Sequence, residues 1–278
     1  MRKWLITAAV LIGVGILVAL VGAAMAGFDF KELSTQKMEK NTFTVEEAFS
    51  DIGVDVTTAD ITFLPASDGK VTVVCFENSK VKHTVQVRDG KLMITEQDNR
   101  KWYDRIGIQF YMSKLTVYLP AGNYGALELK CTTGDVNMPD DFTFLSASLN
   151  RTTGDTLWRA PVQQKFFLKC STGDVELIDM TCKELEIKGT TNDVELIRVN
   201  VAQRMSISIT TGDVDLEYAD AGEIDIKTTT GDVEGTLLSG KLFYVDTTTG
   251  DVRVPESAAG GKCEIKTTTG DIEIRIAK

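Results

Sequence analysis

Apolar and polar residues alternate with a period of two around a repeated phrase, T-T-G-D-V. Two clear copies are TTTGDVEG at Thr228–Gly235 and TTTGDIEI at Thr267–Ile274. Apolar residues occupy the positions seven and five before the glycine and two after it, and polar residues lie between them. This period is typical of a strand with one buried face, whereas a helix would repeat every 3.6 residues. Each repeat therefore predicts a strand, a corner at the glycine, a second strand and a turn.

The corner position recurs in steps of nineteen or twenty residues. Its occupants are Gly134, Gly154, Gly173, Asn192, Gly212, Gly231, Gly250 and Gly270. A fixed period of this length is the signature of a solenoid, in which neighbouring coils supply each other's hydrogen bonds. We expect an all-β chain folded as a parallel β-solenoid (β-helix) of about eight to nine coils, right-handed by the usual rule for parallel connections. A corner with positive φ favours glycine, and Asn192 is the best substitute.

The repeats resemble a bacterial β-strand-repeat family of unknown function whose members carry an adhesin label. The resemblance rests on the T-T-G-D-V-x-L/V phrase, the N-terminal hydrophobic segment, and LTVYLP at Leu115–Pro120 followed by Ala121 and Gly122. It covers nearly all of the chain beyond the hydrophobic segment. The resemblance implies a β-solenoid on a cell surface and no established activity.

The N-terminus predicts a membrane anchor. Arg2 and Lys3 precede an uncharged run over residues 4–28, which as a helix would be about 37 Å long and could cross a bilayer. The basic start places residues 1–3 in the cytoplasm and the C-terminal domain outside, as a single-pass cell-membrane protein. The alternative is secretion after cleavage near Ala26, because Ala24-Met25-Ala26 has the form of a signal-peptidase site. The length of the run favours a retained anchor.

Three regions follow the hydrophobic segment. Residues 29–48 are polar and predict a membrane-proximal spacer. Residues 49–120 form an N-terminal β region, in which Ile52–Phe63 matches the repeat with Ala59 in place of glycine. We interpret this stretch as a degenerate first coil. Residues 121–278 are the β-solenoid repeats, and the last strand ends at Lys278 without a cap, which leaves an edge for end-to-end self-association.

An insert without the repeat period lies between Pro65 and Pro120. His83–Gln97 predicts a hairpin with Asp89 and Gly90 at its turn. An aromatic patch follows, and we expect it to cap the solenoid or, alternatively, to bind a sugar or peptide. The patch consists of Trp102, Tyr103, Phe110 and Tyr111.

An aspartate follows each corner residue, and stacking would place these carboxylates in one column. The column is Asp135, Asp155, Asp174, Asp193, Asp213, Asp232, Asp251 and Asp271. Neighbours about 4.8 Å apart repel by about 0.9 kcal/mol even in water. A charge-assisted hydrogen bond from a backbone amide to each aspartate would contribute about 1.5–3 kcal/mol, which outweighs that repulsion. We therefore expect the aspartates to have a structural role. The alternative is a calcium column that uses Asp135, Asp174, Asp213, Asp232, Asp251 and Asp271.

The composition of the chain argues against several classes of function. A net charge of −10 over 278 residues argues against a nucleic-acid partner. Five cysteines without regular spacing predict buried small residues and no disulfide framework. His83 is the only histidine, so a histidine triad or a two-histidine metal site cannot be built from one chain. Because no phosphate or dinucleotide motif occurs either, we expect no enzyme activity and no cofactor.

These features predict a membrane-anchored, extracytoplasmic, non-enzymatic surface protein. The first hypothesis is a binding or scaffold protein, adhesin-like or envelope-sensing, with a cell-envelope glycan or protein as partner. The second is a structural spacer that self-associates end to end. The third is a glycan-active enzyme, which the identical acids in every coil disfavour.

Overall fold

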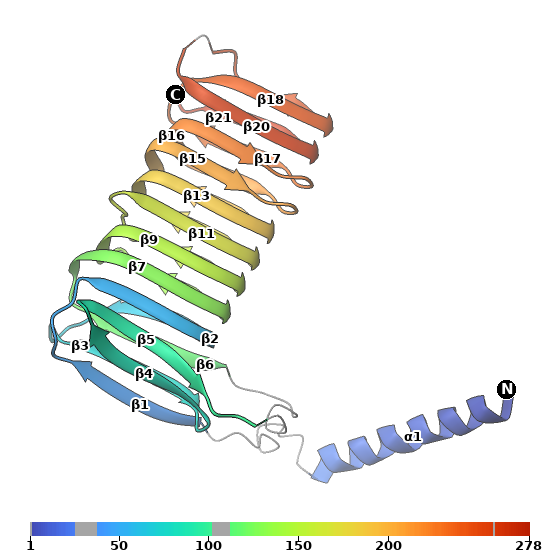
Figure 1. Cartoon of the computed structure of the whole chain (residues 1–278). Helices are drawn as coiled ribbons and strands as arrows, with labels where there is room; N and C mark the ends of the chain where they lie inside the picture. The colour runs from blue at the N-terminus through green and yellow to red at the C-terminus, as the bar shows by residue number, and fades with distance from the viewer. Residues whose placement is uncertain (1, 26–37, 102–111, 258) are drawn as a thin grey trace.

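The computed structural model describes residues 2–25, 38–101, 112–257 and 259–278. Helix α1 spans Arg2–Met25, and the rest of the described chain is built from strands (Figure 1). The all-β prediction is therefore confirmed for the described residues beyond the helix. The predicted transmembrane helix over residues 4–28 is not supported, because no helix in the described ranges combines the length and apolar character that crossing a membrane requires.

The strands follow in chain order. They are β1 (Met38–Val45), β2 (Asp51–Pro65), β3 (Val71–Asn78), β4 (Val81–Arg88), β5 (Lys91–Asp98), β6 (Ser113–Leu119), β7 (Gly122–Thr133), β8 (Val136–Met138), β9 (Phe142–Thr153), β10 (Thr156–Trp158), β11 (Lys165–Thr172), β12 (Val175–Ile178), β13 (Thr181–Thr191), β14 (Val194–Ile197), β15 (Asn200–Ser208), β16 (Val214–Lys227), β17 (Val233–Leu237), β18 (Lys241–Thr249), β19 (Val252–Arg253), β20 (Gly261–Thr269) and β21 (Ile272–Ile276).

The strands form two sheets that face each other across one core. Sheet A has the order β1-β3-β6-β2-β8-β10-β12-β14-β16-β17-β21-β19. Sheet B has the order β4-β5-β2-β7-β9-β11-β13-β15-β16-β20-β18. Strands β2 and β16 contribute to both sheets, and the coils stack into a rod (Figure 1). All these pairings are parallel except β1–β3, β3–β6 and β4–β5.

Equivalent residues of successive coils meet in register, as the repeat period predicts. Leu168 pairs with Leu149 on one side and Ile187 on the other. Leu129 and Ile226 occupy the same column further along the rod, and both are buried. The apolar columns therefore join into one core that runs the length of the solenoid. Its handedness stays a prediction.

The corner glycines are required by both conformation and space. Gly231 has a φ of +142°, and an added Cβ would overlap the carbonyl oxygen of Gly212 in the next coil. Asn192 does not follow the predicted explanation, because it does not have a positive φ. Its buried side chain instead donates from Nδ2 to the carbonyl oxygen of Gly173 at 2.6 Å. Gly189 makes this arrangement possible, because a Cβ there would overlap Oδ1 of Asn192.

The N-terminal β region differs from the expectation in one respect. The predicted spacer over residues 29–48 contains a strand, since Met38–Val45 is β1 and pairs antiparallel with β3. The degenerate first coil is present as β2, with Ala59 fully buried beside the corner of the next coil. The predicted hairpin is present as β4–β5, and both turn residues, Asp89 and Gly90, have positive φ.

The C-terminal coils do not stack in chain order. Strand β16 pairs with β20, and β18 pairs only with β20 among the described strands. Likewise β21 lies between β17 and β19. The strands that end the chain are therefore internal, and the free edge expected near Lys278 belongs to β18 and β19 instead. The hydrogen bonds follow the same order, since the N–H of Gly231 donates to Thr269 and not to Thr249.

Candidate functional site

The predicted aspartate column is present and is bound into the backbone of the solenoid. Six of the eight carboxylates accept a hydrogen bond from the N–H of the aspartate in the next coil, and Asp174 and Asp251 are the exceptions. Oδ1 of Asp193 lies 2.9 Å from the nitrogen of Asp213, and Oδ1 of Asp213 lies 2.8 Å from the nitrogen of Asp232. The same bond links Asp232 to Asp271 at 2.7 Å and Asp271 to Asp251 at 2.8 Å. This arrangement supplies the backbone bonds that the structural interpretation of the column requires.

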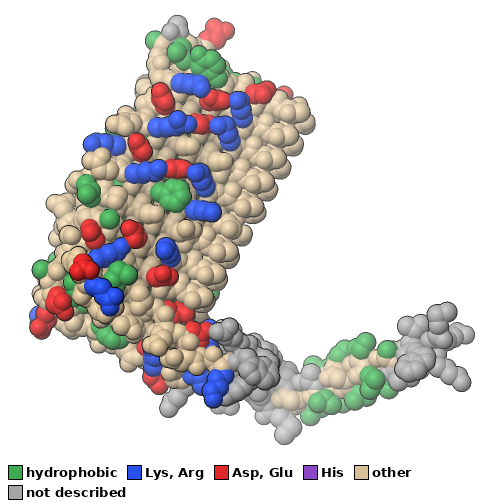
Figure 2. Space-filling model, viewed as in Figure 1, with side chains coloured by type: hydrophobic (Ala, Val, Ile, Leu, Met, Phe, Trp, Pro, Cys, Tyr) green, Lys and Arg blue, Asp and Glu red, His purple; other side chains and the backbone are tan. Residues whose placement is uncertain are grey.

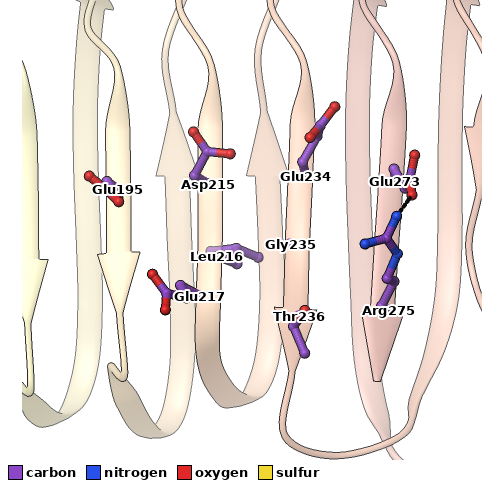
Figure 3. Close-up of a pocket in the computed structure, with 9 residues that line it drawn as sticks. All are labelled: Glu195, Asp215, Leu216, Glu217, Glu234, Gly235, Thr236, Glu273 and Arg275. Carbon is purple, nitrogen blue, oxygen red and sulfur yellow. Dashed lines mark hydrogen bonds and ion pairs between the residues drawn. The ribbon is translucent and has the colours of Figure 1, made fainter. Parts of the chain in front are cut away.

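A second acidic column, which the repeat analysis did not single out, lies two residues further along five of the coils. It consists of Glu176, Glu195, Asp215, Glu234 and Glu273, which pair in register across sheet A. Figure 3 shows these side chains, from Glu195 to Glu273, on neighbouring strands around a shallow groove. The groove has a volume of about 330 Å³, and Glu217 and Arg275 also line it. The two acidic columns together make the outer face of sheet A negative.

Sheet B has an acidic column of its own, in which each acid is paired with a base; its members are Glu128, Glu186, Asp225 and Glu264. Glu264 lies 2.5 Å from both Lys262 and Lys266. These two hydrogen-bonded ammonium groups lower the pKa of Glu264 to about 2. Asp225 and Glu186 each have two basic partners as well. Figure 2 shows the result as interleaved acidic and basic side chains over this face.

The acids of sheet A are not compensated in this way. Among the described residues, Glu195, Asp215 and Glu234 form no ion pair with a basic side chain. Burial, followed by the charges of neighbours such as Glu176, raises the pKa of Glu195. Burial and then the nearby aspartates, Asp213 first, raise the pKa of Asp215. Arg253 and Arg275 reach only Glu273 in this column, at the end of the rod. The uncompensated stretch therefore occupies the middle coils.

A second cavity lies at the corner where β1 ends and β7 begins. It has a volume of about 410 Å³, and its apolar lining includes Val45, Phe49 and Tyr124. The rings of Phe49 and Tyr124 stack with centroids 6.3 Å apart, and the Tyr124 hydroxyl donates to the carbonyl oxygen of Pro120 at 2.7 Å. The predicted patch of Trp102, Tyr103, Phe110 and Tyr111 lies outside the described residues.

Comparison with known protein families shows which family this fold belongs to. A model of the Toastrack family, DUF4097, matches residues 49–278. The chain belongs to the Toastrack family. This confirms the resemblance found in the repeats. No curated protein matches the chain.

Solved structures similar to this Toastrack chain come from several bacteria. A candidate adhesin from Bacteroides fragilis is 18% identical, with a TM-score of 0.49, and the match covers 87% of this chain and 98% of that one. A candidate adhesin from Parabacteroides distasonis is 14% identical, with a TM-score of 0.43 and coverage of 86% and 98%. A candidate lipid-binding protein from the same species is 14% identical, with a TM-score of 0.42 and coverage of 86% and 97%.

Proposed function

We propose that this Toastrack protein is a non-enzymatic surface binding protein that presents the outer face of sheet A to a cationic segment of a cell-envelope protein or glycan. The observation that carries the proposal is the run of uncompensated acids over Glu195, Asp215 and Glu234. Mutual repulsion of these groups lowers the free energy of unfolding. On sheet B, two basic neighbours offset the same cost at Glu186, Asp225 and Glu264. A cationic partner would offset the same cost on sheet A.

The solenoid suits such a role because it holds the acids at a fixed spacing. The carboxylates stand on adjacent strands about 4.8 Å apart, and in-register pairing keeps them in line. A partner with several positive charges can contact several coils without reordering the protein. A preorganised surface of this kind reduces the entropic cost of binding.

We place this activity outside the cytoplasm. The support is the sequence of the N-terminal segment, whose basic start and long uncharged run have the form of an export signal. Retention at the cell membrane and release after cleavage near Ala26 are both compatible with the proposed binding face. Fractionation of cells followed by N-terminal sequencing of the mature protein separates the two, and recovery of the protein in the cytoplasm contradicts the localisation.

A matched pair of triple variants tests the binding face. Glu195→Gln, Asp215→Asn and Glu234→Gln neutralise three acids on sheet A. The control neutralises three paired acids on sheet B with the same change in net charge, and its substitutions are Glu186→Gln, Asp225→Asn and Glu264→Gln. The probe is a fluorescent lysine-rich peptide, and an acidic peptide of equal length serves as the negative probe.

We expect the sheet A variant to bind the lysine-rich peptide about tenfold more weakly. Three exposed charge contacts at about 0.5 kcal/mol each amount to about 1.5 kcal/mol, which corresponds to a factor of about ten. The sheet B variant should change the affinity by less than about twofold. Equal losses in the two variants would show that the peptide responds only to net charge, and the proposed face would then be wrong.

The second candidate function is a spacer that self-associates end to end, and the terminal coil favours it. Phe243 and Val245 are only partly buried, and Val252 is 42% exposed at the free edge. Sedimentation of the full-length protein against a Val252→Lys variant tests this candidate. Leu145→Lys, a change at a similarly exposed apolar residue in the middle of the rod, is the control. Self-association that Val252→Lys does not weaken contradicts this function.

A further inference from the structure

A buried polar cluster lies at the N-terminal end of the rod, far from the acidic face. Cys75 and Glu77 point inward from β3, and His83 points inward from β4. Cys75 and Glu77 are fully buried, and His83 is 4% exposed. One ligand atom from each of the three lies within 4.8 Å of the other two. Within the described residues, this cluster alone brings three such side chains together.

Glu77 fixes the orientation and the tautomer of His83. Its Oε2 accepts the backbone N–H of His83 at 2.6 Å and lies 2.6 Å from Nδ1 of the same residue. Its Oε1 accepts from Nδ2 of Asn41 at 2.5 Å. An ionised carboxylate can only accept, so Nδ1 carries the proton in this hydrogen-bond arrangement. In the neutral ring, Nε2 then carries a free lone pair.

That lone pair has no partner. Nε2 of His83 is a buried polar atom without a hydrogen bond. Burying an unsatisfied polar group costs about 1–3 kcal/mol, and such an atom in a folded protein calls for a physical reason. A neutral imidazole held through Nδ1 by a carboxylate, with Nε2 free, is the arrangement found where histidine binds a metal ion.

The thiol of Cys75 is the second candidate ligand in this cluster. Burial, and then the charge of Glu77, raise the pKa of Cys75 to about 12. A metal ion would therefore bind in exchange for the thiol proton. Thiolate and imidazole together select soft or borderline ions such as Zn²⁺.

We propose that Cys75 Sγ and His83 Nε2 bind a zinc ion, with Glu77 as the residue that orients the imidazole. Zinc bonds of about 2.3 Å to sulfur and 2.0–2.1 Å to nitrogen bridge two ligand atoms up to about 4.4 Å apart. The Cys75 sulfur lies within 4.8 Å of a ring nitrogen of His83, so the two side chains are close to the separation that zinc requires. Water completes the coordination, because a carboxylate that holds Nδ1 lies across the ring from an ion at Nε2.

The site would connect the two sheets where the regular coils end. β3 belongs to sheet A, β4 belongs to sheet B, and the two outermost strands meet there through a Lys82–Glu39 ion pair at 2.5 Å. An ion bound across the sheets adds its binding free energy to the stability of this end. This inference does not depend on the proposed binding face.

The single histidine makes a direct test feasible. Full-length protein without a histidine tag is labelled with ¹⁵N-histidine and titrated with Zn²⁺ in detergent solution. We expect one equivalent of Zn²⁺ to shift the ¹⁵N resonance of Nε2, while Nδ1 keeps its proton. No shift at Nε2 in the folded wild-type protein overturns the proposal, and this measurement requires no variant.

Cysteine variants then identify the second ligand. Cys75→Ser should lower the Zn²⁺ affinity by at least 100-fold, whereas Cys263→Ser should leave it unchanged. Cys263 is a matched control, because it is also fully buried and burial also raises its pKa to about 12. Glu77→Gln should weaken binding by about 10–100-fold. Unchanged affinity in Cys75→Ser, with the fold verified by circular dichroism, excludes the proposed site.

Discussion

The hydrogen bonds of the aspartate column can be measured at one position, Asp213. Its Oδ1 accepts from the nitrogen of Asp232 at 2.8 Å, and its own nitrogen donates to Asp193 at 2.9 Å. Asp213→Ala removes both the acceptor and the charge, whereas Asp213→Asn removes the charge and keeps an acceptor. The difference between the two variants therefore isolates the hydrogen bond.

The expected magnitudes follow from the spacing of the coils. Repulsion from the two neighbouring carboxylates, at about 4.8 Å each, is about 0.9 kcal/mol per neighbour in water and about half of that at physiological ionic strength. Removing the charge thus gains about 1 kcal/mol. A charge-assisted bond contributes about 1.5–3 kcal/mol and a neutral one about 0.5–1.5 kcal/mol. Asp213→Asn should therefore be nearly neutral, and Asp213→Ala should be about 1 kcal/mol less stable than Asp213→Asn.

Urea unfolding followed by circular dichroism measures these free energies of unfolding. At about 1 M salt the Debye length falls to about 3 Å, so the gain from removing the charge should vanish. Asp213→Asn should then be about 1 kcal/mol less stable than the wild-type protein. If Asp213→Ala is as stable as Asp213→Asn at both salt concentrations, the bond contributes nothing and the explanation of the column is wrong.

Three further substitutions test the corner, the core and the acidic face. Gly231→Ala should lower the free energy of unfolding in urea by about 3 kcal/mol or more, because its Cβ would overlap Gly212. The control is Gly69→Ala, where φ is +69° and the space is open, and it should lower that free energy by about 1 kcal/mol. Ile226→Asp buries an unpaired charge and should abolish cooperative melting, so an unchanged melting temperature would contradict the core assignment. Glu195→Gln should stabilise the protein by about 0.5–1 kcal/mol at pH 7. The folded-state pKa of Glu195 is raised, so its ionised form destabilises the fold above that pKa. The stability gained by Glu195→Gln should therefore disappear as pH falls below the ordinary pKa of 4.5. If the variant stays more stable than the wild-type protein at that pH, repulsion of the ionised carboxylate is not the cause.

The sequence predicts the stacking well because one rule repeats in every coil. Alternation around the corner places Leu168 and Ile226 in the core, and both are fully buried. The same alternation does not determine the order of the last coils. The repeats around Gly250 and Gly270 are nearly identical in pattern, so either could pair with β16. The choice depends on packing at the end of the rod, where Cys263 is fully buried and Phe243 is not.

The polar features depend on contacts that no single repeat contains. Asn192 occupies a glycine position through a side-chain bond and a gap at Gly189, three residues away, and not through its φ. Glu77 continues the inward positions of Val73 and Cys75 in β3, and a charged residue on an apolar face is the signal that could have drawn attention to it. Its partner, His83, lies on the opposite sheet, so pattern alone could not connect the two.

The exchanged order of the final repeats bears on how the protein is made. β20 and β21 are synthesised after β18 and β19, yet they lie between β16–β17 and β18–β19. The rod therefore cannot be completed by winding one coil after another as the chain emerges. β18 and β19 must leave room beside β16 and β17, or give up a provisional contact with them, until β20 and β21 have been synthesised. A chain that stops before Gly261 would therefore lack the two strands that join β16 and β17 to β18 and β19.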